Sequence, residues 1–115
     1  MFAQIAIIFT TGDTSAAYEL FSSEYTDHQR PEWMEKSGPD EFKSIVQLAR
    51  DSMPNLVVTI EGPIIADEEM VAGRLHWKSD IRERETIEIL RIHNGKFIEH
   101  WGAKSWSKNI DHSEL

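Results

Sequence analysis

The chain of 115 residues contains no cysteine, which excludes disulfide bonds and thiolate metal sites. It also lacks any run of about 20 apolar residues, the length that a membrane-spanning helix requires. Basic residues are scarce relative to acidic ones: the chain has 12 Lys and Arg and 20 Asp and Glu, which gives a formal net charge of −8. This balance argues against nucleic acid or an anionic membrane as a partner. The apolar residues 2–9 lack the basic segment and cleavage site of a secretion signal, so we expect a cytoplasmic protein.

The length suits a single domain, which we expect over residues 1–103, followed by a loose tail at residues 104–115. Apolar residues recur at helical spacing in three segments of the first half. The first begins at Phe2 and ends before Gly12, and the second is a short helix of about two turns around Leu20. The third has Pro39 in its first turn and ends before Pro54.

The second half alternates apolar and polar residues, which is typical of strands. The expected strands cover residues 56–61, 70–79, 84–93 and 96–103. Gly62-Pro63 should break or bulge the first of them. Asn94-Gly95 should join the last two in a tight hairpin, because a type I′ turn needs positive φ at both central residues. Helices followed by a meander of strands predict an α+β fold.

The hairpin also carries a family resemblance. Residues 87–102 read Ile-Glu-Ile-Leu-Arg-Ile-His-Asn-Gly-Lys-Phe-Ile-Glu-His-Trp-Gly, which resembles the closing hairpin of SnoaL-like polyketide cyclases. Tyr25-Thr26-Asp27-His28 and Ala72-Gly73-Arg74 agree with the family pattern at the expected places along the chain. The resemblance implies the nuclear transport factor 2-like fold, in which three N-terminal helices pack on a curved antiparallel sheet and form a cone-shaped pocket.

Glu88 lies on the mostly apolar face of its strand, and it aligns with the acid that the family's cyclases use as general acid/base. The resemblance implies an aldol-type ring closure of a carbonyl compound, with no cofactor and no metal. A carboxyl can both take and return the proton if an apolar pocket brings its pKa near neutrality. Glu stands here in place of the usual Asp. The competing interpretation is a structural Glu88 paired with Arg74 or Arg91.

Other polar and aromatic residues could complete such a site. His28 matches a family histidine at the pocket mouth and could assist catalysis. It lies, with Tyr25 and Trp33, in the segment 22–38, which we expect to be irregular. The remaining candidates for contacts with a small hydrophobic or carbonyl-containing ligand are Arg74, Leu90, His100 and Trp101. His100 and Trp101 are adjacent on a strand, so only one of them can face the pocket.

One departure from the family keeps other functions open. The loop at residues 78–83 is shorter than the family's and lacks its polar pocket residue. A non-catalytic binding or scaffolding domain on the same fold is therefore the alternative to an enzyme. A dehydratase or hydrolase would need a second carboxylate near Glu88, for which Asp27 and Glu99 are the nearest candidates. Finally, Ile87 and Ile89 lie on the opposite face of the hairpin, between the charged residues Glu85 and Arg91. An apolar centre with a polar rim predicts a homodimer through the outer face of the sheet.

Overall fold

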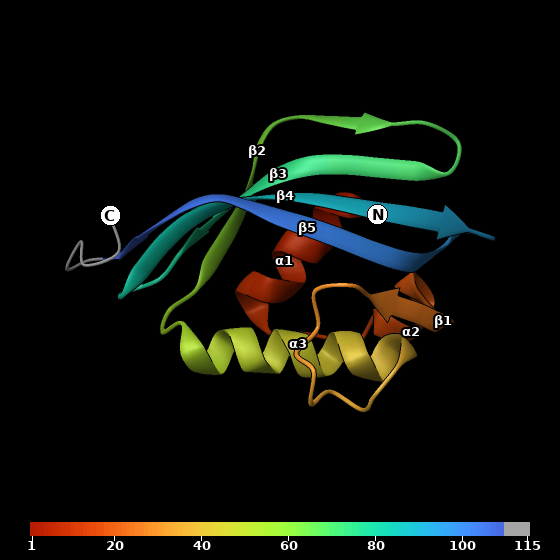
Figure 1. Ribbon diagram of the computed structural model, residues 1–115, viewed down its shortest axis with the longest axis horizontal. Coiled ribbons are helices and arrows are strands. Elements are labelled where there is room, and N and C mark those ends of the chain that lie inside the picture. The colour runs from red at the N-terminus through yellow and green to blue at the C-terminus, as the bar shows by residue number, and fades with distance from the viewer. Residues whose placement is uncertain (110–115) are drawn as a thin grey trace.

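The structure is a computed structural model that describes residues 1–109, with side chains described for residues 1–103. Within this part of the chain, helices cover one face of a sheet (Figure 1). The elements follow in the order α1 (Phe2–Thr11), α2 (Ala17–Leu20), β1 (Phe21–Asp27), α3 (Gly38–Ser52), β2 (Val57–Ala66), β3 (Met70–Lys78), β4 (Arg82–His93) and β5 (Lys96–Asn109). The predicted α+β class, with three helices on a curved sheet, is confirmed.

The helices begin and end near the predicted residues. Gly12 takes a left-handed conformation with φ of 78° and donates its N–H to the Ile8 carbonyl at 2.8 Å, which ends α1. Pro39 lies in the first turn of α3, where its missing N–H costs nothing. α2 has four residues rather than the expected two turns, because Phe21 already takes the extended backbone of the next strand.

The strands form one sheet in the order β1-β5-β4-β3-β2, with β1 parallel to β5 and the other pairs antiparallel. The prediction that residues 22–38 are irregular is wrong for β1. This strand pairs with β5 from far away in the sequence, and its register shifts between Phe21 and Thr26. The shift interrupts the two-residue alternation by which a strand is recognised from sequence.

Two other strands are longer than predicted. β2 passes through Gly62-Pro63 with a register shift and continues to Ala66. β5 pairs with β4 as far as Asn109, so the predicted loose tail is wrong for residues 104–109; residues 110–115 lie outside the described part. The predicted hairpin turn is confirmed, because Asn94 and Gly95 have φ of 51° and 77°.

The sheet bends over α1 and α3, which lie on the same side of it (Figure 1). Aromatic rings fill the layer between them: Phe21 stacks on Phe42 at 4.0 Å between ring centroids, and Phe9 packs edge-on against Trp77 at 4.9 Å. The face of the sheet turned to the helices is called the inner face below, and the opposite one the outer face. Among the described residues, no helix has both the length and the apolar character needed to cross a bilayer.

Candidate active site

A cavity of about 650 Å³ lies between the inner face of the sheet, α3 and the loop that follows β1. This volume falls within the range of about 300–1,000 Å³ that is usual for small-molecule sites. Much of the wall is apolar, with Ile45 and Met53 from the α3 side and Leu75 and Trp77 from β3. Two groups of charged side chains line the cavity, on either side of Thr86 on β4. One group contains Asp27, Glu88 and His100, and the other contains Arg82 and Arg84.

Glu88 lines the cavity from the middle of β4, and only 8% of the residue is exposed. Its neighbours across the sheet are Gly73 on β3 and Gly102 on β5. A Cβ atom at Gly102 would lie 3.0 Å from Oε1 of Glu88, and one at Gly73 would lie 2.7 Å from the Phe2 ring. Glycine at these two positions therefore leaves space for the carboxyl on one side and for a core aromatic ring on the other.

His100 joins Glu88 to a second carboxylate. Its Nε2 lies 2.5 Å from Oε1 of Glu88, and its Nδ1 lies 2.9 Å from Oδ1 of Asp27. Asp27 also accepts a hydrogen bond from the backbone N–H of Gln29 at 2.8 Å and one from the Tyr25 hydroxyl at 3.2 Å. The three side chains come from β4, β5 and β1, so the parallel pairing of β1 with β5 brings the cluster together.

The two carboxylates determine the protonation of the imidazole. Burial alone would lower the pKa of His100, but hydrogen bonds to Asp27 and Glu88 and the charges of both outweigh burial and raise it from 6.5 to about 9. Burial acts to raise the pKa of Asp27, but the hydrogen bond from His100 and the charge of His100 lower it overall. Near neutral pH the ring is therefore an imidazolium that donates to both carboxylates.

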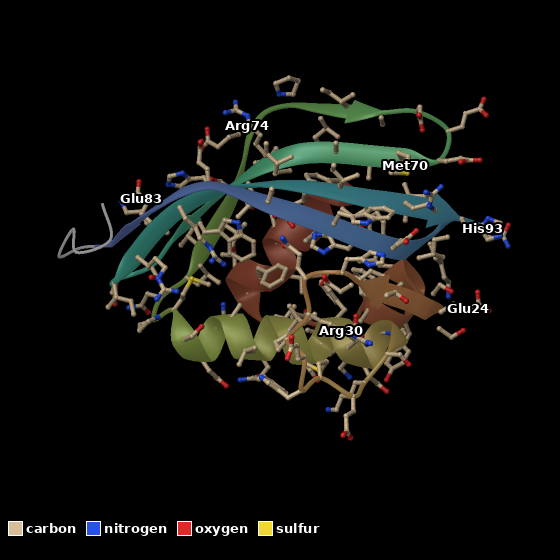
Figure 2. All side chains as sticks on the ribbon, in the orientation of Figure 1. Glu24, Arg30, Met70, Arg74, Glu83 and His93 are labelled. Atoms are coloured by element: carbon tan, nitrogen blue, oxygen red, sulfur yellow. The ribbon has the colours of Figure 1, made fainter. Side chains whose placement is uncertain are left out.

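An ion pair between the buried Glu41 and the exposed Arg30 supports the end of β1 that carries Asp27. Glu41 on α3 is fully buried and accepts the backbone N–H of Asp27 at 2.8 Å. The guanidinium of Arg30 donates to the same carboxylate at 2.7 Å and lies in the loop beside α3 (Figure 2). Because an unpaired buried charge is strongly unfavourable, this pair fixes the end of β1 against α3 and holds Asp27 in place.

The structure places the other predicted catalytic residue, His28, at the cavity rim. Its Nε2 lies 2.8 Å from Oε2 of Glu99, and its ring stacks on Trp101 with centroids 5.1 Å apart. His28 also borders the cavity, but the histidine that contacts Glu88 is His100.

Tyr25, Leu90 and His100 line the cavity, whereas three other predicted ligand contacts lie outside it. Trp33 is 67% exposed and borders a separate, shallower depression against α3. Trp101 and Arg74 lie outside the cavity, and Arg74 projects from the outer side of the sheet (Figure 2). The competing interpretation of Glu88 as the ion-pair partner of Arg74 or Arg91 is wrong, because those arginines pair with other glutamates.

The sequence indicated Asp27 only as a possible second carboxylate and did not indicate Arg82 and Arg84 as cavity residues. The alternation of β4 could have found the arginines, since residues 82, 84, 86 and 88 share a face. Among the described residues, no group of three or more His, Asp or Glu side chains is arranged to hold a metal ion.

Comparison with known proteins places this arrangement in context. The family described as SnoaL-like polyketide cyclase matches residues 2–104. The fold is similar to a "putative polyketide cyclase" from Bacillus cereus, with a TM-score of 0.76 and 23% identity over 89% of this chain and 70% of that one. It is also similar to a SnoaL-like polyketide cyclase from Agrobacterium tumefaciens (TM-score 0.74, 10% identity, 90% and 87% covered) and to IdmH from Streptomyces antibioticus (0.72, 17%, 90% and 88%). At these identities the structural likenesses show the fold alone. No curated protein matches the sequence.

Proposed function

The chain belongs to the SnoaL-like polyketide cyclase family, and we propose that it is an enzyme that performs acid/base chemistry on a carbonyl compound, an aldol-type cyclisation or an isomerisation. The observation that carries this proposal is the chain of hydrogen bonds Asp27–His100–Glu88 inside a largely apolar cavity. A catalytic base is commonly held in place by a hydrogen-bonded group that a further residue orients, and here His100 and Asp27 would hold Glu88 in this way.

In the proposed step, the Glu88 carboxylate takes a proton from a carbon next to a carbonyl group. The electron pair left on that carbon attacks a second carbonyl carbon of the same molecule and forms the new carbon–carbon bond. The oxygen of the second carbonyl becomes negative and takes the proton back from Glu88. An isomerisation uses the same removal and returns the proton to another carbon.

The contacts of Glu88 suit this role. His100 occupies Oε1 at 2.5 Å, so Oε2 is the oxygen that we expect to take the substrate proton. Because Asp27 fixes the other ring nitrogen, the imidazole cannot rotate away without losing both bonds. His100 is therefore a positioning residue for the Glu88 carboxyl, and Asp27 is a positioning residue for the imidazole.

The test measures the first half of the reaction and needs no knowledge of the natural substrate. The methyl protons of 2-acetylnaphthalene exchange slowly with deuterated water, and nuclear magnetic resonance follows their loss. We expect the wild-type protein to accelerate exchange and Glu88→Gln to reduce that acceleration by about 100-fold or more. Glu85→Gln is the matched control, because Glu85 lies on the same strand but faces the outer side, near Arg74.

Exchange at the wild-type rate in Glu88→Gln would contradict the assignment of Glu88. A wild-type protein that binds the ketone but leaves its exchange rate at the buffer value would favour the alternative, a domain that binds small molecules without reaction. The short turn of three residues between β3 and β4 is the feature that keeps this alternative open.

A further inference from the structure

The second polar group in the cavity consists of two arginines. Arg82 and Arg84 lie on the inner face of β4, the same face as Glu88, and both line the cavity. At about 3.3 Å per residue, the Cα of Arg84 lies about 13 Å along the strand from that of Glu88. The two groups are therefore separated along β4 by Thr86, whose hydroxyl accepts the indole N–H of Trp77 at 2.7 Å, and the apolar Met53 also lines the cavity.

The described residues provide no anionic partner for these arginines. The ion pairs among those residues include neither Arg82 nor Arg84. Nε of Arg84 is buried and has no hydrogen-bond partner in the described part of the chain, although the guanidinium lies over the Trp77 ring at 5.3 Å. A buried donor without a partner is unfavourable, and such a group commonly marks a place where a ligand binds.

The electrostatics of Arg82 and Arg84 also favours a bound anion. Burial lowers the pKa of Arg84 and the neighbouring positive charge of Arg82 lowers it further, which together outweigh the opposing effect of the more distant Glu88 carboxylate. Two like charges at a partly buried site repel each other, and an anion placed between them would remove this repulsion and satisfy the free donors.

We propose that Arg82 and Arg84 bind a carboxylate group of the substrate at the far end of the cavity from Glu88. The substrate class is then an elongated carboxylic acid with an apolar or aromatic middle and a reacting carbonyl near Glu88. A carboxylate fits because its two oxygens match the planar donors of a guanidinium, and the apolar walls suit the uncharged middle. The position of the reacting carbonyl rests on the proposed function, whereas the binding of the carboxylate does not.

Direct binding of three matched probes tests this site. Isothermal titration calorimetry compares 2-naphthoate, the uncharged 2-naphthamide, and 2-naphthyl phosphate on the wild-type protein. We expect 2-naphthoate to bind at least about tenfold more tightly than 2-naphthamide, as expected for charge-assisted hydrogen bonds. Equal affinity of these two probes would overturn the proposal. Tighter binding of the phosphate than of the carboxylate would overturn the carboxylate assignment in favour of a phosphorylated substrate.

Variants locate the carboxylate. Arg84→Gln should reduce the preference for 2-naphthoate to less than about threefold and leave the affinity for 2-naphthamide unchanged, which also shows that the variant is folded. Arg74→Gln is the matched control on the outer face and should keep the full preference. An Arg84→Gln protein that keeps the full preference, or that loses affinity for both probes equally, would overturn the proposal.

Glu88→Gln separates this inference from the proposed function. The variant should lose proton exchange but keep the preference for 2-naphthoate. If the wild-type protein prefers 2-naphthoate but catalyses no exchange, only the proposed function fails. If it catalyses exchange but shows no preference, only the carboxylate site fails.

Discussion

Nε2 of His100 lies 2.5 Å from Oε1 of Glu88, and the same imidazole reaches Asp27 through its other nitrogen. One ring thereby connects β4, β5 and β1. The parallel pairing of β1 with β5 joins segments that are far apart in the chain. The position of Asp27 on β1 therefore depends on that of His100 on β5, and the reverse also holds. The protonation of His100 should therefore affect both the stability of the fold and the geometry of the cavity.

The first prediction concerns stability against pH. The pKa of His100 is raised from 6.5 to about 9 in the folded protein, chiefly by its hydrogen bonds to Asp27 and Glu88 against the opposing effect of burial. Because the folded protein binds this proton more tightly, the stabilisation is fully present below pH 6.5 and is lost as the pH rises to about 9. Thermal unfolding followed by circular dichroism should show a falling midpoint across this window.

His100→Gln provides the comparison for that measurement, since other groups also titrate. The difference in midpoint between the wild-type protein and His100→Gln should be largest near pH 6.5 and should shrink towards pH 9. His93→Gln is the control, because His93 is exposed at the hairpin turn, and its midpoint should follow the wild type throughout. A difference that does not change over this window would show that the imidazole is not bound as a cation.

The second prediction compares His100, on β5 of the hairpin, with His28, in the loop that follows β1. His100→Gln should slow exchange of 2-acetylnaphthalene by about 100-fold, because Glu88 loses the group that orients it. His28→Gln should leave the rate within about threefold, since His28 contacts Glu99 and Trp101 and not Glu88. The opposite order of effects would assign the assisting role to His28, as the sequence predicts.

The third prediction concerns the glycine beside Glu88. The Cβ of Gly102→Ala would lie 3.0 Å from Oε1 of Glu88 and 2.6 Å from the side-chain oxygen of Gln29. Gln29 can move, but Glu88 is held by His100, so we expect displacement of the carboxyl and a loss of about tenfold in exchange rate. Ala103→Gly, at the next position of the strand, is the control and should keep the wild-type rate. An unchanged rate in Gly102→Ala would show that the position of Glu88 is not critical.

The sequence predicted the hairpin and the inward position of Glu88, but it left open which of His100 and Trp101 faces the cavity. Counting outward from the turn at Asn94-Gly95 pairs Glu88 with Trp101 and places Trp101 on the inner face. A register shift next to Ile92 instead pairs Glu88 with Gly102 and Leu90 with His100, which turns His100 inward. One extra residue in a strand exchanges its two faces, and local sequence preferences do not show where such a bulge occurs.

The position of Asp27 depended on a contact that sequence periodicity cannot show. β1 is the only parallel strand among those described, and it lies at the edge of the sheet beside β5. Helix ends, by contrast, were predictable from Gly12 and Pro39, because those residues restrict the local backbone. Local chemistry thus determined the boundaries of the helices, while long-range pairing determined which side chains meet at the site.

The last prediction is a homodimer formed through the outer face of the sheet. Ile87 is 43% exposed there, and Ile89 lies opposite Trp101 on the neighbouring strand. The ion pair of Arg74 with Glu85 lies beside this apolar centre, as polar groups do at the rim of an interface. We expect sedimentation velocity at micromolar concentration to show a dimer, and Ile87→Lys to convert it to a monomer because a buried, unpaired charge would oppose association. Ile7→Lys is the control, since Ile7 is 59% exposed on α1, on the other side of the sheet, and should tolerate the charge. A wild-type monomer under these conditions would rule out the interface.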